Sequence, residues 1–209
     1  MTGISARPGL TKPGYNWRVV DIVVAALISI AGGVIFWAWD QMALVVTPVT
    51  AGYPPLGGLI AGGWMIPAVL GMLVVRKPGA AIFCEMVAAT SELIMGNQYG
   101  TTVLISGLLQ GLGAELIFLA FMYKKFNLPV SLLAGAGAGL FCGLNDSFLP
   151  WGWNIAYEVG DKLAYIVFCT ISGAVIAGAL AWIATRGLAK TGVLSAFASR
   201  KAASEPVFS

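Results

Sequence analysis

Four carboxylates lie inside long apolar stretches of this sequence, where an ionised side chain is costly. They are Glu85, Glu92, Glu115 and Asp146. A charged residue at the centre of a membrane helix costs roughly 2.5 to 3.5 kcal/mol on insertion scales, so each of the four is a candidate functional residue. Glu85 and Glu92 are seven residues apart, about two helical turns, and therefore share one face of a helix. No lysine or arginine lies at a comparable depth to neutralise these carboxylates.

Amide and aromatic side chains are expected to accompany the carboxylates. This group consists of Asn97, Gln110, Asn145, Trp37, Trp64 and Trp151. Such a site suits a cationic aromatic ligand, because the charge can pair with a carboxylate, the ring can stack on indole faces, and polar ring edges can bond to amides. The sequence therefore predicts a substrate-binding site for a cationic ring compound.

Some of these residues have structural alternatives. Gln110 and Glu115 are five residues apart and do not share a helix face cleanly. Glu115 could be a protonated carboxyl group bonded to a facing backbone carbonyl. Glu85 could either serve such a structural role or contact the ligand. Glu92 is the stronger ligand candidate, because it is expected near the outer surface. A single aromatic residue is more often an anchor at the membrane interface, so the aromatic residues are informative only as a group.

Other kinds of chemistry are poorly supported. The chain has no histidine, and its three cysteines, Cys84, Cys142 and Cys169, lie in apolar runs without CxxC spacing. A Walker A motif, a GxGxxG motif and an HExxH motif are also missing from the sequence. We therefore expect no catalytic residues, no metal site and no cofactor. Active transport would require ion coupling or a partner that hydrolyses ATP.

The composition indicates that membrane helices position these residues. Hydrophobic residues make up 58% of the 209 residues, charged residues make up 10%, and the mean hydropathy is +0.86. At about 20 residues for each span, the chain holds roughly six transmembrane helices. Apolar runs, separated by short segments of polar, charged, glycine or proline residues, predict transmembrane spans at 19–39, 56–75, 78–95, 101–123, 128–148 and 163–188. The expected fold is thus an all-α bundle over 18–190, with tails at 1–17 and 191–209.

The basic residues indicate how this bundle is oriented. Eleven of the twelve lie on one side of the expected spans: Arg7, Lys12, Arg18, Arg76, Lys77, Lys124, Lys125, Arg186, Lys190, Arg200 and Lys201. By the positive-inside rule that side is cytoplasmic, as are both termini. The opposite side carries Lys162 with Asp40, Glu158 and Asp161.

Two stripes of small residues recur at four-residue spacing. They are Ala25, Ser29 and Gly33 in the first span, and Gly135, Gly139 and Gly143 in the fifth. Such stripes allow close helix packing, either within the chain or against a partner.

Residues 75–120 resemble the YkoE family, the thiamine-associated substrate-binding (S) components of energy-coupling factor (ECF) transporters. The matching motifs are Arg76-Lys77-Pro78-Gly79-Ala80-Ala81, Glu85 with Glu92, Gly96-Asn97, and Gln110-Gly111-Leu112-Gly113-Ala114-Glu115. Asp146 and the segment Thr191-Gly192-Val193-Leu194 also fit. The resemblance is looser outside these central residues.

The resemblance implies a six-helix S component in the plasma membrane of a prokaryote. It would capture thiamine from outside, without enzymatic activity, and associate with a transmembrane coupling (T) protein and two ATPases. Ala25, Ser29 and Gly33 would dock the coupling protein, and no nucleic-acid partner is expected. One alternative cargo is hydroxymethylpyrimidine (HMP) or a related thiamine precursor. A second alternative is an autonomous ion-coupled carrier.

Overall fold

Six helical passes form the bundle in the computed structural model, which describes residues 15–208. The expected N-terminal residues 1–14, with Arg7 and Lys12, and residue 209 lie outside the described residues. The passes are α1 (Val19–Thr50), η1 (Pro54–Met65) with α2 (Ile66–Val75), α3 (Ala80–Met95), η2 (Gly100–Thr102) with α4 (Val103–Ala120), α5 (Leu128–Phe148), and α6 (Val159–Ser172) continued by a π-helical segment (Gly173–Ala179) and α7 (Leu180–Lys190). The predicted six-helix membrane fold is confirmed. Five passes are long and apolar enough to span a bilayer, whereas α3 has 16 residues.

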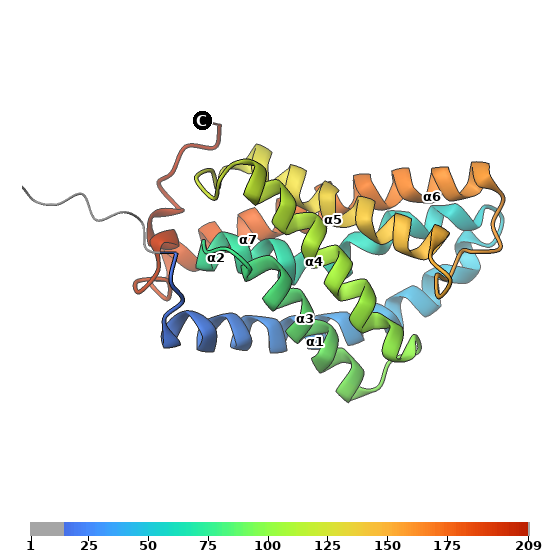
Figure 1. Cartoon of the computed structure of the whole chain (residues 1–209), viewed down its shortest axis with the longest axis horizontal. Coiled ribbons are helices and arrows are strands. Elements are labelled where there is room, and N and C mark those ends of the chain that lie inside the picture. Colours follow the sequence, from blue (N-terminus) through green and yellow to red (C-terminus); the bar gives the residue numbers. More distant parts are fainter. Residues whose placement is uncertain (1–14, 209) are drawn as a thin grey trace, which may run out of the picture.

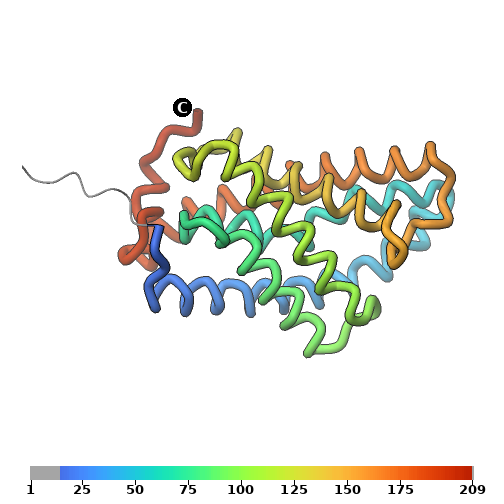
Figure 2. Tube along the Cα trace, viewed as in Figure 1, coloured from blue at the N-terminus to red at the C-terminus, as the bar shows by residue number. Residues whose placement is uncertain are grey.

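Both ends of the described chain lie at one end of the bundle (Figure 2). This end also carries the α2–α3 and α4–α5 turns, and we call it the basic end, after Arg18, Arg76, Lys77, Lys124, Lys125, Arg186, Lys190, Arg200 and Lys201. The other end carries the α3–α4 turn and the α5–α6 connection with Tyr99, Trp151 and Trp153, and we call it the aromatic end.

The second pass changes its position as it crosses the bundle. Neighbouring elements form a closed ring in the order α1, α3, α4, α5, α6 and η1. The second half of the second pass, α2, instead contacts α1, α3, α4, α5 and α7, so it fills the centre of the ring. Eight of the ten residues of α2 are buried. The ring is therefore filled by a helix at the basic end and only lined by η1 at the aromatic end.

The first helix is longer than the expected span at 19–39. α1 continues eleven residues further, to Thr50, so the expected boundary was wrong. The cause is Asp40, which was expected at the outer surface but is 0% exposed. Its Oδ1 accepts a hydrogen bond from Trp64 Nε1 at 2.9 Å. A carboxylate that receives a hydrogen bond can remain inside a helix bundle, so Asp40 does not end the helix.

Both stripes of small residues pack within the chain. Gly135 and Gly139 of α5 lie against the last helix, where an added Cβ would stand 2.1 Å from Gly173 O and 2.2 Å from Cys169 O, respectively. Gly33 lies against α3, where a Cβ would be 2.4 Å from Ser91 Cβ.

The stripe of Ala25, Ser29 and Gly33 is buried, with Ala25 and Ser29 both 0% exposed. The expectation that it docks a coupling protein is therefore corrected. Small residues at these positions let α1 and α3 approach closely, and this internal contact covers the stripe.

The segment expected as a C-terminal tail folds onto the basic end (Figure 1). Leu194 and Phe197 are 2% and 4% exposed, and Ser199 Oγ donates to Val74 O at 2.7 Å. Both terminal nitrogens of Arg76 donate to the Glu205 carboxylate at 2.7 Å. This segment closes the basic end of the ring.

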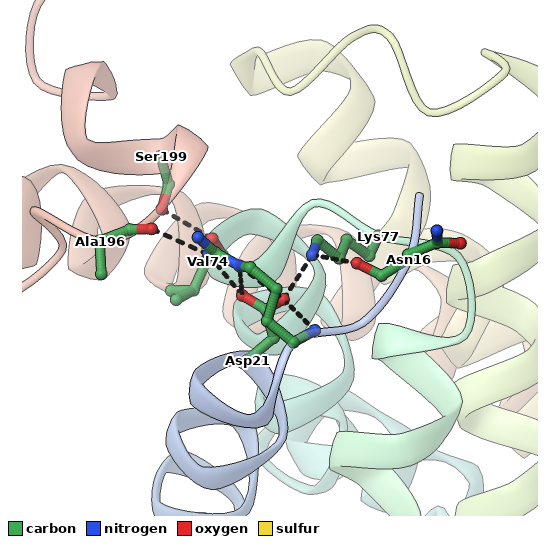
Figure 3. Close-up of polar contacts among 7 residues, drawn as sticks. Asn16, Asp21, Val74, Lys77, Ala196 and Ser199 are labelled. Atoms are coloured by element: carbon green, nitrogen blue, oxygen red, sulfur yellow. Dashed lines mark hydrogen bonds and ion pairs between the residues drawn. The ribbon is translucent and has the colours of Figure 1, made fainter. Parts of the chain in front are cut away.

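An ionic network joins three segments at the same end (Figure 3). Asp21, near the start of α1, is 0% exposed and accepts from Arg18 N and Arg18 Nη2, each at 2.7 Å. The Lys77 ammonium, from the α2–α3 turn, pairs with the same carboxylate. Arg18 Nη2 also donates to Ala196 O at 2.9 Å. Asp21 therefore links the first helix directly to the α2–α3 turn, and through Arg18 to the C-terminal segment.

We expect Asp21→Asn to destabilise the bundle by about 3 kcal/mol, because it leaves the ammonium of Lys77 without its counter-ion in a buried position. Thermal unfolding in detergent should show a clear drop in midpoint temperature. Asp161→Asn, an isosteric change near the aromatic end, is the matched control. Asp161 lies in the first turn of α6, so its loss removes only a helix-dipole contribution of about 0.3 to 1 kcal/mol and should lower the midpoint much less. Equal midpoints for the two variants would contradict this role of Asp21.

Candidate functional site

A cavity of about 500 Å³ lies between the six passes and opens at the aromatic end. Exposed residues of its rim include Ala51, Pro54 and Trp153. The cavity exists because η1 stays in the wall while α2 occupies the centre only at the basic end. Its size is typical of sites for small organic molecules.

Glu85 and Gln110 form the floor of the cavity. Glu85 is 0% exposed, and its Oε2 accepts from Ala68 N, in the first turn of α2, at 2.8 Å. With its amide oriented to donate, Gln110 Nε2 bonds to Glu85 Oε1 at 3.1 Å and to Trp64 O at 3.0 Å. Backbone N–H groups in the first turn of a helix lack intrahelical partners and favour an anion. Glu85 therefore anchors α2 and lines the site.

Glu92 and Asp40 form a carboxyl pair in the wall of the cavity. Glu92 lines the cavity and is 2% exposed. Asp40 lies behind it and interacts directly with the Glu92 carboxyl group. Within the described residues, Asp40 Oδ2 and Glu92 Oε1 are buried and have no hydrogen-bond partner. This pair is the part of the site with unused hydrogen-bonding capacity.

Asp146 lies on the opposite wall and is well supplied with donors. Tyr165 OH donates to its Oδ2 at 2.9 Å, and Asn145 Nδ2 donates to its Oδ1 at 2.8 Å. Asn145 is itself held by Trp151, whose Nε1 donates to Asn145 Oδ1 at 3.0 Å. Both carboxyl oxygens of Asp146 are thus held in place by donors, and Asn145 and Trp151 support this arrangement.

Three aromatic rings lie in succession along the outer part of the cavity. Trp64 and Tyr99 have centroids 6.0 Å apart, and Tyr99 and Trp153 have centroids 5.1 Å apart, both edge to face. Burial raises the pKa of Tyr99 to about 12, so its phenol is neutral at physiological pH. These rings can pack on a flat ligand, and their faces attract a cation.

The remaining predicted residues lie away from the cavity. Trp37 is 40% exposed on α1 and is not part of the lining. Asn97 shapes the α3–α4 turn, because its Oδ1 accepts from Tyr99 N at 2.8 Å and Gly100 N at 2.6 Å.

Glu115 lies at the basic end, where it accepts from Gly79 N at 2.7 Å and Ala81 N at 3.0 Å. These two N–H groups belong to the start of α3. Tyr123 OH also donates to Glu115 Oε1 at 2.9 Å. The structural alternative for Glu115 is therefore the one that the geometry supports. Its partners are backbone N–H donors, however, and not the carbonyl acceptor that was expected.

Several site residues were missed in the sequence. The sequence predicts Asp40 at the surface because the expected first span ends at residue 39, eleven residues before the end of α1. Tyr99, Trp153 and Tyr157 are not among the predicted site residues, yet they line the cavity. Tyr165 gave no signal, since a tyrosine in an apolar run is unremarkable until its partner Asp146 is known.

Comparisons with known proteins give concordant results. A family model described as "ABC-type cobalt transport system, permease component" matches residues 20–141. The protein described as "Putative HMP/thiamine permease protein YkoE" from Bacillus subtilis (strain 168) is 37% identical over 188 residues, which are 89% of this chain and 92% of that protein. A crystal structure of an S-component of an ECF transporter superposes with a TM-score of 0.81 at 37% identity, covering 89% of this chain and 92% of the other.

Glu115→Gln provides a test of the division between site and scaffold. Loss of the charge at the start of α3 should lower stability by about 1 kcal/mol and shift thermal unfolding in detergent to lower temperature. Because Glu115 lies away from the cavity, ligand affinity should remain within about twofold of wild type at a temperature where both proteins are folded. A large loss of affinity would place Glu115 in the site.

Proposed function

This chain belongs to the YkoE family of ECF transporter S components, and we propose that its cavity captures thiamine from outside the cell for uptake. As an S component it is a membrane transport protein and not an enzyme. The observation that carries the thiamine assignment is a cavity with carboxylates on opposite walls and an aromatic wall between them. The relative YkoE is described as an HMP/thiamine permease, which supports the same cargo.

The charges of the site suit the thiazolium ring of thiamine. Asp146 presents a carboxyl group held by two donors on one wall, and the Asp40–Glu92 pair adds acidic groups on the facing wall. The ion pairs Arg18–Asp21, Lys77–Asp21 and Arg76–Glu205 all lie at the basic end, remote from these carboxylates. A permanently charged ring would therefore be attracted into the cavity, where a neutral ring of the same shape would gain less.

The aminopyrimidine of thiamine offers several polar edges. Glu92 lines the cavity, and its carboxyl group can accept a hydrogen bond from an amino group of the ligand. Trp64, Tyr99 and Trp153 provide surfaces for the ring. The ligand is thus held by a few polar contacts within an otherwise apolar enclosure, as is usual for small-molecule sites.

We assign the basic end to the cytoplasm by the positive-inside rule. The cavity then opens to the exterior, which is where an importer must capture its cargo. The chain lacks nucleotide-binding motifs, and ECF S components work with a T protein and ATPases. We propose that this chain likewise obtains its energy from a T protein and two ATPase subunits.

HMP is the second candidate cargo, because the relative's description includes it. A cobalt ion, which the family model's description suggests, is not supported by the donor set. The chain has no histidine, and no group of three or more histidine, cysteine, aspartate or glutamate residues in the described chain is placed to hold a metal ion. Hard or borderline metal ions of this kind require such convergent ligands.

We expect Asp146→Asn and Glu92→Gln each to weaken thiamine binding by about 10- to 100-fold, the effect of losing one charge-assisted contact worth roughly 1.5 to 3 kcal/mol. Calorimetry with purified protein in detergent, without ATP, measures this directly. Glu158→Gln changes an exposed acid at the start of α6 and is the matched control, with wild-type affinity expected. Unchanged binding in both site variants would remove these carboxylates from the site.

Competition between thiamine and HMP distinguishes the two cargoes. If the thiazolium charge is recognised, thiamine should bind at least about tenfold more tightly than HMP. The Asp146→Asn variant should show a smaller difference between the two affinities. Tighter binding of HMP would make the precursor the cargo.

The carrier alternative makes a different prediction. Liposomes that contain this chain alone should show no thiamine uptake under a proton or sodium gradient, because an S component requires its partners. Gradient-driven uptake by the single chain would establish the carrier instead.

A further inference from the structure

The Asp40–Glu92 pair has a feature that the other carboxylates of the chain do not share. Glu85, Glu115 and Asp146 each receive at least two hydrogen bonds. Asp40 and Glu92 face each other, and each keeps a buried oxygen without a partner among the described residues. We propose that the pair shares one proton before the ligand binds and releases it when a cationic ligand enters, so that capture of the cation is coupled to proton release.

The geometry makes double ionisation of the pair costly. Asp40 is 0% exposed and Glu92 is 2% exposed, so water screens neither group effectively. Two carboxylates in contact under such conditions repel each other strongly, and one proton held between them relieves this repulsion. Among residues 15–208, the single donor to the pair from outside it is Trp64 Nε1, which bonds to Asp40 Oδ1 at 2.9 Å. This neutral hydrogen bond stabilises one negative charge better than two.

In the part of the chain that the structure describes, no facing group supplies the missing positive charge. The titratable groups around the pair are Tyr99 from the α3–α4 turn, Glu85 lower on α3 and Asp146 from α5. Gln98 adds a neutral amide, which donates to Asp40 O at 3.5 Å. The pKa of Tyr99, raised to about 12, keeps its phenol protonated, so it does not accept the proton. The facing groups are therefore neutral or acidic.

The cations that pair with Asp21 are too distant to replace a ligand's charge, and the Lys162 ammonium at the aromatic end lies over the Phe148 ring. Asp21, where Arg18 and Lys77 bind, is 19 residues from Asp40 on the same helix, about 28 Å at 1.5 Å per residue. A thiazolium group in the cavity would be the first positive charge beside the pair. Its field favours the doubly ionised form, and the shared proton is then released.

The sign of the pH dependence follows from this coupling. Because the unliganded protein holds more protons than the complex, thiamine affinity should rise with pH, by up to about tenfold per pH unit where one full proton is released. The effect should fade at high pH, where the pair has already lost its proton. This inference rests on the proposed function, because it takes a permanently charged ligand as the trigger.

The test is calorimetry of thiamine binding at one pH in two buffers with different heats of ionisation. The difference in observed heat gives the number of protons released, which should approach one for wild type near neutral pH. HMP has no permanent charge and should release far fewer protons. Glu158→Gln should behave as wild type.

Two variants test whether the released proton comes from the Asp40–Glu92 pair or from other titratable groups. Glu92→Gln removes the proton-holding partner and should abolish the release. Asp40→Asn leaves the cavity lining intact, because Asp40 lies behind Glu92, and should shift the release to lower pH. If Glu92→Gln fails to fold or to bind thiamine, the proton release measured for Asp40→Asn still tests the inference. Release that is unchanged in Asp40→Asn would overturn the inference.

The inference and the proposed function fail in different ways. Thiamine binding without proton release in wild type would overturn the inference and leave the function intact. Absence of thiamine binding to folded wild-type protein would overturn the function.

Discussion

The bundle depends on how it satisfies carboxylates that are removed from water. An unpaired charge in a bilayer is costly, and a chain without histidine can answer it only with basic side chains, hydroxyls, amides, indoles or backbone N–H groups. Each solution is used at a different place. Asp21 is paired with Arg18 and Lys77, Glu85 and Glu115 meet the starts of α2 and α3, and Asp146 is held by a phenol and an amide.

These solutions also determine where the helices begin. Glu115 fixes the start of α3 from α4, and Glu85 fixes the start of α2 from α3. The second contact lies at the point where η1 passes into α2. It therefore marks the boundary between the filled and the open half of the ring. A buried carboxylate that anchors a helix and faces a cavity serves fold and function through one set of contacts.

The sequence was sufficient for properties that depend on composition, and insufficient for those that depend on contacts. Hydropathy predicted six passes, and the fifth span, 128–148, matches α5 at both ends. Asp40 is an example of a residue whose position could not be predicted from hydropathy. Read alone, an aspartate after Trp39 ends an apolar run. Only the indole of Trp64, 24 residues away, shows that this aspartate has a donor inside the bundle. The stripe of Ala25, Ser29 and Gly33 was likewise ambiguous, because small residues permit close approach without specifying the partner.

The separation of charge between the two ends gives the cavity its selectivity. Four of the basic residues at the basic end, Arg18, Arg76, Lys77 and Arg186, are engaged by Asp21, Glu205 and backbone carbonyls of the C-terminal segment. They therefore hold that end together and do not neutralise the acids of the cavity. Had one lysine lain beside Glu92, the wall would be a satisfied ion pair and would offer a cation little. The capacity to bind a cationic ring thus depends on the carboxylates that α1 and α3 carry. It depends equally on the absence of basic residues from these two helices at the same depth.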